Sequence, residues 1–494
     1  MSQAKRMKSS ENKGNSKNYT RKKGSNRLDN ILKVIAFVYV VITIIFYIAI
    51  LKMNLLPTFY IAIFTIAEII FTVAMVVGLV KKHKTLKLNL FCFLIILVVS
   101  FVYIHATKYA MATMDFLGNV LTEVNETEEY YVVVRNSNKY NQIEDVENQN
   151  IYLFQAADDV KEEISNKVSI EYDQKDNLKD LGDQLIGKEI EAILVSSTQY
   201  NILDEEIKDF KTNTKIIYTA KHTIETKTSV SNTNSKHTIK NGIFNIYISG
   251  IDTSGSISNV ARSDANIIAT VNTKTHEILL TSIPRDYYVT LYGKGAKDKL
   301  THSGIYGINE TITTVEDLLD IDINYYVRVN FTTVIKVVDT LGGIDVYSDY
   351  DFTSGAYSFS KGYNHINGEE ALVFSRERYA FADGDNQRIK NQQHVIEAII
   401  KKVMNSTTIL TKYTNILSSL ENSFQTNIAQ EDISNLVKEQ LQNMSSWKIT
   451  NNALTGTGAY GSTYSMGSQQ LYVMIPDSTS VQNAKDKIEN ILGE

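Results

Sequence analysis

The sequence predicts an α/β protein: an α/β/α sandwich preceded by three transmembrane helices and a small α/β accessory domain. Three long apolar runs lie near the N-terminus, and strand-like and helix-like runs alternate over the rest of the chain. The 494 residues suffice for two domains and a membrane anchor. We expect a basic cytoplasmic tail at 1–28, the three helices at 29–108, an extracellular accessory domain at 109–238 and the sandwich at 239–494.

Each apolar run is long enough to cross a bilayer as a helix. The runs are Val34–Leu51, Leu55–Val80 and Leu88–Ala106. A cleavable signal peptide would have one short apolar core, so three full spans predict a retained anchor. Glu68, within the second run, is either functional or satisfied by protonation or by a polar group on a neighbouring helix. Cys92 is the single cysteine, which excludes a disulfide within the chain and leaves a lipid-facing or helix-packing role.

Basic residues flank the spans unevenly, and this bias sets the orientation. Met1–Arg27 holds nine Lys or Arg and one acid, and Lys81–Lys84 between the second and third spans is also basic. The loop between the first two spans has only Lys52. The N-terminus is therefore expected in the cytoplasm and everything after about Lys108 outside the cell. The tail lacks apolar periodicity, so we expect it to be disordered and to set the topology, with a nucleic-acid-binding arm as the alternative.

The first outer segment shows short strand-like runs separated by polar, helix-compatible stretches such as Asp158–Val168. It contains no metal cluster, nucleophile motif or glycine-rich loop, so a spacer or partner-binding role is expected. The Ser-, Thr-, Asn- and Lys-rich stretch Thr228–Asn241 is typical of a linker. The expected strands are Tyr130–Val134, Ile151–Phe154, Ala192–Val195 and Lys215–Thr219.

The second outer segment alternates strands and helices throughout, which predicts the sandwich. The last ninety residues, with the strand-like run Gln470–Ile475, are expected to complete it. The expected strands are Phe244–Ser249, Ile267–Val271, Glu277–Ile283, Tyr325–Val329 and Ile344–Tyr347, and the expected helices are Gly307–Leu319, Thr332–Leu341, Ala371–Arg376 and Asp385–Met404.

Arginine and aspartate recur together in this second segment. Asp252 and Arg285 follow predicted strands, which is where α/β folds bind ligands. Arg376 and Arg378 alternate along the chain, as on one side of an extended segment, whereas Arg388 and Gln392 share a helix face. The clusters are Gly250-Ile251-Asp252, Arg262-Ser263-Asp264, Pro284-Arg285-Asp286, and Arg376-Glu377-Arg378 followed by Asp385, Arg388 and Gln392.

Arginines and aspartates in this pattern suit a diphosphate. Guanidinium groups bind phosphate oxygens bidentately, and two carboxylates beside them can hold a divalent cation that also binds phosphate. The pattern thus describes a diphosphate clamp around Mg²⁺ or Mn²⁺, to which Lys299 could add a further cation. Simple structural ion pairs, Arg262 with Asp264 and Arg285 with Asp286, are an equal alternative on charge and spacing alone.

The order of several sequence blocks resembles the LytR-CpsA-Psr (LCP) family. The three spans and the extra outer domain are similar to the capsule-biosynthesis (CpsA-like) branch of that family. The blocks are Asn245–Asp252, Arg262–Asp264, Ser282–Asp286, Tyr325–Phe331, Val338–Val346, His365–Leu372 and Arg376–Arg378, then Asp383–Asp385, Arg388 and Gln392-Gln393.

The resemblance implies a phosphotransferase that moves a polyprenyl-pyrophosphate-linked polysaccharide, here a capsular one, onto a peptidoglycan sugar hydroxyl and releases polyprenyl phosphate. It implies Mg²⁺ or Mn²⁺ on Asp252 and Asp264, with Asp385 orienting arginines. It further implies contact with membrane lipid and with other capsule-assembly membrane proteins. The residues expected to bind pyrophosphate are Arg262, Arg285, Lys299, Arg376, Arg378, Arg388 and Gln392, and those expected to act in catalysis are Asp252, Arg262, Asp264 and Arg285.

Two other functions fit the same residues. A membrane regulator could bind lipid diphosphates and signal without turnover, and its basic tail would then matter for its effect. A pyrophosphatase would use the same clamp with water as the nucleophile, and it would release a sugar phosphate.

Overall fold

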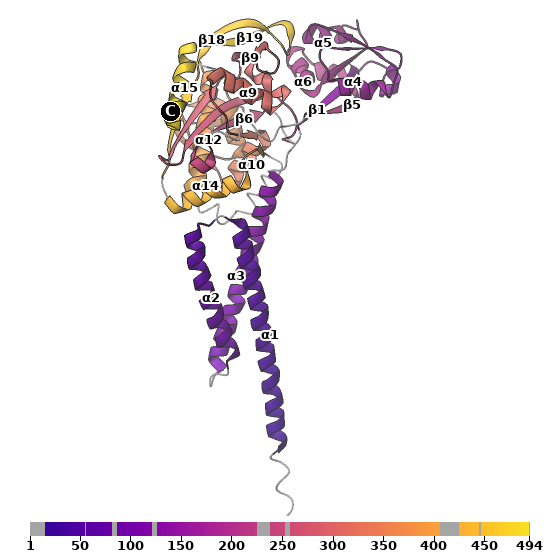
Figure 1. The fold of residues 1–494 in the computed structure, drawn as a ribbon. Coiled ribbons are helices and arrows are strands. Elements are labelled where there is room, and N and C mark those ends of the chain that lie inside the picture. Colours follow the sequence, from indigo (N-terminus) through magenta and orange to yellow (C-terminus); the bar gives the residue numbers. More distant parts are fainter. Residues whose placement is uncertain are drawn as a thin grey trace, which may run out of the picture. The chain divides into compact units, whose positions relative to one another are not determined.

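The computed structural model describes residues 15–54, 56–81, 86–120, 126–224, 238–251, 257–382, 384–405, 424–443 and 446–493 (Figure 1). The chain divides into two compact units, residues 1–115 with 434–444 and residues 116–433 with 445–494. Asp252, Asp383 and most of the predicted linker lie outside the described residues.

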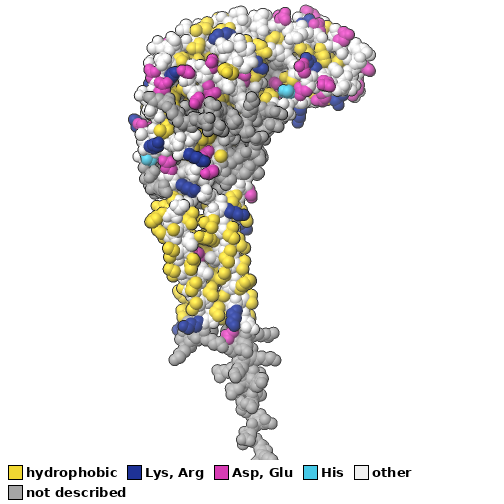
Figure 2. Space-filling view, in the orientation of Figure 1, with side chains coloured by type: hydrophobic (Ala, Val, Ile, Leu, Met, Phe, Trp, Pro, Cys, Tyr) yellow, Lys and Arg dark blue, Asp and Glu magenta, His cyan; other side chains and the backbone are white. Residues whose placement is uncertain are grey.

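Three helices form the N-terminal part: α1 (Asn15–Met53), α2 (Thr58–Val80) and α3 (Leu86–Val120). Each is long and apolar enough to cross a membrane, as predicted, and Figure 2 shows hydrophobic side chains along them. Helix α1 begins at Asn15 and so includes residues 15–27 of the basic stretch, while the disorder expected of this tail stays a prediction for the residues before it. Lys and Arg are good helix formers, and extending an existing helix needs no new nucleus.

Glu68 and Cys92 have packing roles within these helices. The Glu68 carboxylate is buried and accepts hydrogen bonds from Tyr103 Oη at 2.5 Å and Thr72 Oγ1 at 3.1 Å. Cys92 Sγ would lie 2.6 Å from a Cβ added at Gly78, so the missing side chain lets α2 and α3 approach closely. The hydrogen bond from Tyr103 in α3 agrees with the alternative that a polar group on a neighbouring helix binds the Glu68 carboxylate.

Residues 126–224, which we call the accessory region, form a five-stranded sheet of order β3-β2-β4-β1-β5. β1 pairs antiparallel with β4 and β5, and β2 pairs parallel with β3 and β4. Its elements are β1 (Glu126–Arg135), η1 (Ile143–Val146), β2 (Asn150–Leu153), α4 (Asp158–Ser165), β3 (Glu171–Gln174), α5 (Leu178–Ile186), β4 (Ala192–Ser196), α6 (Ser197–Glu206), α7 (Phe210–Asn213) and β5 (Thr214–Ile224).

Both faces of the accessory sheet are buried. Val133 packs with α5 and α6, whereas its neighbours Val132 and Val134 pack with η1 and α4. This alternation follows from the two-residue period of a strand. A strand covered on both sides reads as a continuous apolar run, which explains why the sequence located β1 and β4.

The second sheet has six strands in the order β16-β11-β6-β7-β8-β17. β7 is antiparallel to both β6 and β8, while β11 is parallel to β6 and β17 is parallel to β8. The strands are β6 (Ile243–Ile251), β7 (Ser263–Asn272), β8 (Glu277–Ile283), β11 (Tyr325–Val329), β16 (Phe424–Thr426) and β17 (Lys448–Ala453).

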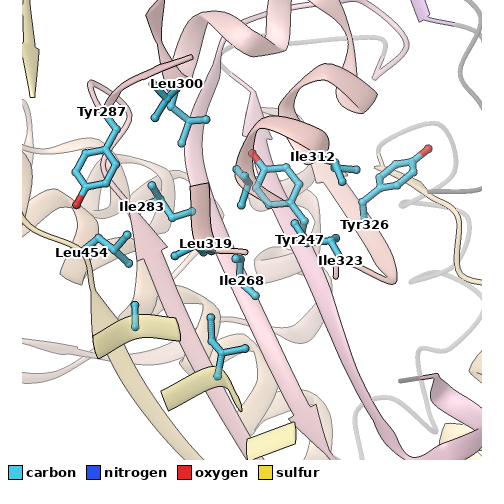
Figure 3. Packing of buried hydrophobic residues seen from close by; sticks show 14 of the residues in the cluster. Tyr247, Ile268, Ile283, Tyr287, Leu300, Ile312, Leu319, Ile323, Tyr326 and Leu454 are labelled. Carbon is cyan, nitrogen blue, oxygen red and sulfur yellow. The ribbon is translucent and has the colours of Figure 1, made fainter. Parts of the chain in front are cut away.

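Helices α9 (Ile308–Leu319) and α15 (Ser478–Leu492) pack on this sheet through the largest core cluster. Figure 3 shows Tyr247 and Ile268 from the sheet beside Ile312 and Leu319 from α9. Because α15 and β17 are C-terminal, the expectation that the last ninety residues complete the sandwich is confirmed.

Helices α10 (Phe331–Leu341), α11 (Gly368–Arg376) and α12 (Asp385–Asn405) form another helical layer around a separate core. Gln393 anchors α12 to the sheet, because its Nε2 donates to Leu280 O at 3.3 Å and Asn452 O at 2.6 Å. The remaining elements are η2 (Ile239–Asn241), β9 (Tyr288–Leu291), β10 (Ala296–Lys299), α8 (Leu300–Ser303), η3 (Gly304–Tyr306), β12 (Ile344–Ser348), β13 (Phe352–Ser354), β14 (Tyr357–Phe359), β15 (Gly362–Ile366), α14 (Gln430–Asn443), β18 (Gly456–Thr463) and β19 (Gly467–Pro476).

Candidate active site

The ends of β6 and β8 and the start of β7 meet at one edge of the six-stranded sheet. β6 and β8 run the same way because both are antiparallel to β7. Asn266 pairs with Ile283, so continuing this register by two residues places Asp264 opposite Arg285. The sheet topology therefore brings together two clusters that are separate in sequence, at the edge where α/β folds bind ligands.

Asp264 is held from two sides. Arg285 Nη1 donates to its Oδ2 at 2.8 Å, and Thr301 Oγ1 donates to its Oδ1 at 2.9 Å. Burial opposes ionisation of Asp264, but the positive charges of Arg285, Arg262 and Arg388 outweigh burial and lower the pKa of this carboxyl. Asp264 is therefore an ionised group within a set of guanidinium groups.

Thr301 was not predicted from the sequence. Its backbone N–H donates to Arg285 O at 2.8 Å, which fixes the short helix α8 beside the end of β8. The only feature of the sequence that could have pointed to Thr301 is its position two residues after Lys299, which was a candidate site residue.

Lys299 and Asp286 form a second pair beside the first. Lys299 Nζ lies 3.0 Å from Asp286 Oδ1, and Arg285 Nε lies 3.9 Å from the same oxygen. Both side chains of the Lys299–Asp286 pair are largely buried. The alternative pairing of Arg285 with Asp286 is thus the longer contact, and Lys299 lies beside the Arg285–Asp264 pair.

The first turn of α12 contributes a third pair, Arg388 with Asp385. Burial raises the pKa of Asp385, the Arg388 charge opposes this rise, and the charge of Asp286 adds to it. Arg378 lies within electrostatic range of both acids, and the pKa of Arg378 is raised, mainly by its hydrogen bond from Nη2 to Tyr379 Oη at 2.5 Å. Asp385 thus forms an ion pair with Arg388 and lies within electrostatic range of Arg378, next to the arginines that it was expected to orient.

Arg262 completes the cluster with a partner from the accessory region. Its Nη1 and Nη2 donate to Glu205 Oε2 and Oε1 at 2.8 and 2.7 Å. Arg262 therefore forms a bidentate pair with a residue that the sequence analysis did not identify. Glu205 lies in an acidic run at the end of α6, and nothing in that run distinguishes it.

Arg376 and Gln392 are placed differently from these residues. Arg376 is exposed, and its guanidinium carbon lies 4.2 Å from the ring centroid of Phe331 at the start of α10. Gln392 is half-buried, and no hydrogen bond in the described part of the chain joins it to Arg388 or Asp264. Both remain predictions as pyrophosphate-binding residues, and the placement of Asp252 lies outside the described residues.

We call Arg262, Asp264, Arg285, Asp286, Lys299, Asp385 and Arg388, together with Glu205, the charged cluster. Four of its cations each face a carboxylate at one sheet edge. Guanidinium groups held in this way can also bind phosphate oxygens, which match guanidinium in the same bidentate manner as carboxylates do.

The donor set also fits a divalent ion that arrives with phosphate. Each Asp264 oxygen accepts one hydrogen bond and keeps capacity for a second interaction. Within the described ranges, no three His, Cys, Asp or Glu side chains are grouped so as to hold a metal. This arrangement suits Mg²⁺, which typically uses one or two carboxylates and completes its shell with water and phosphate.

Comparisons with known proteins identify the family of this chain. Residues 208–487 match the LytR_cpsA_psr family. A Bacillus cereus protein named polyisoprenyl-teichoic acid–peptidoglycan teichoic acid transferase TagU is 34% identical over 259 residues, which cover 52% of this chain and 80% of that protein. The Bacillus subtilis protein of the same name is 40% identical over 191 residues, 38% of this chain and 61% of that protein.

The crystal structure of Bacillus subtilis TagU shares 34% identity and gives a TM-score of 0.41, covering 51% of this chain and 97% of that one. The chain therefore belongs to the LytR-CpsA-Psr family. It is an enzyme of the LCP phosphotransferase type, anchored by its three apolar helices.

Proposed function

We propose that this enzyme transfers a glycopolymer from polyprenyl pyrophosphate to a sugar hydroxyl of peptidoglycan and releases polyprenyl phosphate. The main support is the charged cluster, in which Arg262, Arg285, Lys299 and Arg388 lie at one sheet edge. The names of the relatives describe a transfer of the same kind, from a polyisoprenyl-linked polymer to peptidoglycan.

In the proposed reaction, the acceptor hydroxyl oxygen attacks the phosphorus nearer the sugar. A bond forms between that oxygen and phosphorus, and the bond from this phosphorus to the bridging oxygen breaks. Polyprenyl phosphate leaves with the bridging oxygen and its new negative charge. Arginines and Lys299 would stabilise this charge, because phosphoryl transfer depends mainly on positioning and electrostatics. The hydroxyl proton would pass to solvent or to the leaving polyprenyl phosphate, because the lowered pKa of Asp264 makes this carboxylate a poor proton acceptor.

Asp264, together with Asp252, would hold Mg²⁺ or Mn²⁺, which when bound neutralises phosphate charge. The chain's own residues would bind and orient the diphosphate around it. We also propose that Arg376, Arg378 and Gln392 contact the phosphates or the adjoining sugar, as the family resemblance implies.

For the polymer, we propose a capsular polysaccharide, on the basis of the three-span anchor and the accessory region. A teichoic acid is the second candidate, because both similar Bacillus proteins carry that substrate in their names. Supplying each lipid-linked polymer to the purified enzyme in turn would separate the two.

The peptidoglycan acceptor requires the charged cluster to lie outside the cell. We propose that the N-terminus is cytoplasmic, that residues 109–494 are extracellular, and that the accessory domain is 109–238 and the catalytic domain 239–494. The polyprenyl chain would then remain in the membrane, where other capsule-assembly proteins could deliver it.

The test is transfer of a lipid-diphosphate oligosaccharide to peptidoglycan by Arg285→Ala and Asp264→Asn. Loss of a charge-assisted phosphate contact should reduce turnover about 10²-fold or more. Lys448→Ala is the matched control, because this lysine forms an exposed ion pair with Glu277 at the start of β17. Wild-type turnover by both site variants would refute the assignment.

Product analysis in the same assay separates the alternatives. A sugar–phosphate–peptidoglycan bond supports the transferase. A released sugar phosphate would identify a pyrophosphatase. Binding of the lipid diphosphate without any product, combined with loss of a cellular effect on deletion of the basic tail, would identify a regulator.

A further inference from the structure

The accessory region reaches the charged cluster through Glu205. This residue lies in the last turn of α6, and both of its carboxylate oxygens bind the two terminal nitrogens of Arg262. The Arg262 side chain is largely buried, and that of Glu205 is half-exposed. The charge of Arg262 lowers the pKa of Glu205 against the effect of burial, with Arg285 adding to the lowering. Glu205 is therefore an anion at the rim of the cluster.

Glu205 differs from the other three carboxylates of the charged cluster in the part of the chain from which it comes. Asp264, Asp286 and Asp385 belong to the same segment as the cations that they face. Glu205 precedes residue 208, where the match to the LytR_cpsA_psr family begins. The partner of Arg262 is thus supplied by a part of the chain that the family match does not include.

The end of α6 is held in place by several contacts with the hairpin β18–β19. Gln469 Nε2 donates to Glu206 Oε2 at 3.0 Å, and Gln155 Nε2 donates to Tyr464 O at 3.2 Å. Met466, at the tip of the hairpin, is buried in the accessory core beside α5 and α6. This combination of apolar and polar contacts fixes the position of Glu205 relative to Arg262.

We propose that Glu205 is a positioning residue for the lipid-diphosphate donor: it fixes the guanidinium plane of Arg262, so that the accessory region completes the donor site. The inference rests on the proposed function. A guanidinium has five N–H donors in a rigid plane, and Glu205 engages one N–H on each terminal nitrogen. Fixing the plane before the donor arrives lowers the entropic cost of binding it.

The opposite possibility is that Glu205 competes with phosphate for Arg262, and the two possibilities predict opposite changes. Loss of a positioning carboxylate weakens donor binding, because Arg262 loses the bidentate contact that orients its guanidinium plane. Loss of a competing anion strengthens donor binding, because the cluster becomes more positive. The sign of the change in KM therefore decides between them.

The experiment compares Glu205→Ala and Glu205→Gln in the full-length, detergent-solubilised enzyme, with Glu206→Gln as the matched control. Glu206 lies on the same helix, and the amide oxygen of Glu206→Gln can still accept the hydrogen bond from Gln469, so this variant removes a charge and keeps the contact with the hairpin. We expect the KM for a lipid-diphosphate oligosaccharide to rise on the order of tenfold in Glu205→Ala, with a smaller change in kcat. Glu205→Gln should be intermediate, because its amide oxygen still accepts one hydrogen bond. A KM equal to that of Glu206→Gln, or below the wild-type value, overturns the proposal.

A double-mutant cycle with Arg262→Ala excludes a general structural effect. If Glu205 acts through Arg262, adding Glu205→Ala to Arg262→Ala should not raise KM further. An equal rise in both backgrounds would show that the loss is structural and would overturn the positioning role. The site variants separate this proposal from the proposed function. If Arg285→Ala and Asp264→Asn both keep wild-type turnover, the proposed function fails. If these two variants lose turnover and the Glu205 variants match the control, the proposed function stands and the role of Glu205 fails.

Discussion

At the residue scale, burial and charge act in opposite directions on the acids of the molecule, and their balance differs from site to site. Asp264 faces three guanidinium groups, which lower its pKa despite burial. Asp385 has one close arginine, and burial together with the nearby Asp286 raises its pKa. Charge therefore outweighs burial at Asp264, whereas burial outweighs the charges of the arginines at Asp385.

At Glu128 on β1, the effect of burial on the pKa exceeds the effect of the neighbouring hydrogen bonds and charge. Burial raises the pKa of Glu128 to about 7, against hydrogen bonds from Ser196 and Tyr130 and the charge of His222, which lower it. The unfolded chain should have the ordinary value near 4.5. Between these two pKa values the folded state binds the Glu128 proton more tightly than the unfolded chain does. The contribution of Glu128 to the free energy of unfolding therefore falls as pH rises from about 4.5 to about 7, and it is constant above that range.

We predict that Glu128→Gln removes this dependence. The wild type should lose up to about 3 kcal/mol of stability between the two pKa values, and the variant should lose little. Thermal unfolding of the solubilised protein at several pH values measures the difference. Glu129→Gln is the control, because this neighbouring residue is only half-buried and its carboxylate accepts a hydrogen bond from Tyr131. Parallel pH curves for wild type and Glu128→Gln would contradict the prediction.

At the element scale, a buried ion pair joins the two sheets. Arg328 on β11 contacts Glu126 at the start of β1, and both side chains are almost fully buried. Glu126 Oε2 also accepts from Ile308 N at 2.9 Å, at the first residue of α9, where a negative charge is favourable. One carboxylate thus links a strand of each sheet and the N-terminus of a helix.

We predict that Glu126→Ala lowers the free energy of unfolding by about 3–5 kcal/mol, because it leaves Arg328 buried without its carboxylate. Urea unfolding followed by circular dichroism measures the loss. Glu277→Ala should cost about 0–1 kcal/mol, since its lysine partner Lys448 is exposed. Equal costs for the two substitutions would show that the buried pair does not hold the sheets together.

Elements were more predictable from the sequence than their arrangement. Buried strands such as β6 and β8 are rich in β-branched, aromatic and other apolar residues, and α9 has a clear helical period, so their positions were found. The strand order depends on pairings between distant residues, which local patterns do not encode. Thr301 and Glu205 were missed for the same reason: each acts through a contact made only in the folded chain, across 37 and 57 residues.

At the scale of the whole molecule, three membrane helices precede a sugar-polymer transferase. Three spans place the two ends of the anchor on opposite sides of the membrane. The basic residues before the first span favour the cytoplasm for the N-terminus, and a peptidoglycan acceptor requires the enzyme outside. Sequence charge and proposed chemistry therefore favour the same orientation, which stays a proposal.

Cysteine labelling tests this orientation. Ser137 lies in an exposed turn after β1, whereas Ser10 lies in the basic tail, and the native Cys92 is buried. In intact cells, a membrane-impermeant maleimide should label Ser137→Cys and leave Ser10→Cys unlabelled, and both should react after permeabilisation. The wild type measures the background from Cys92. Labelling of Ser10→Cys alone in intact cells would place the charged cluster in the cytoplasm, where the enzyme could not reach peptidoglycan, and would contradict both the orientation and the proposed acceptor.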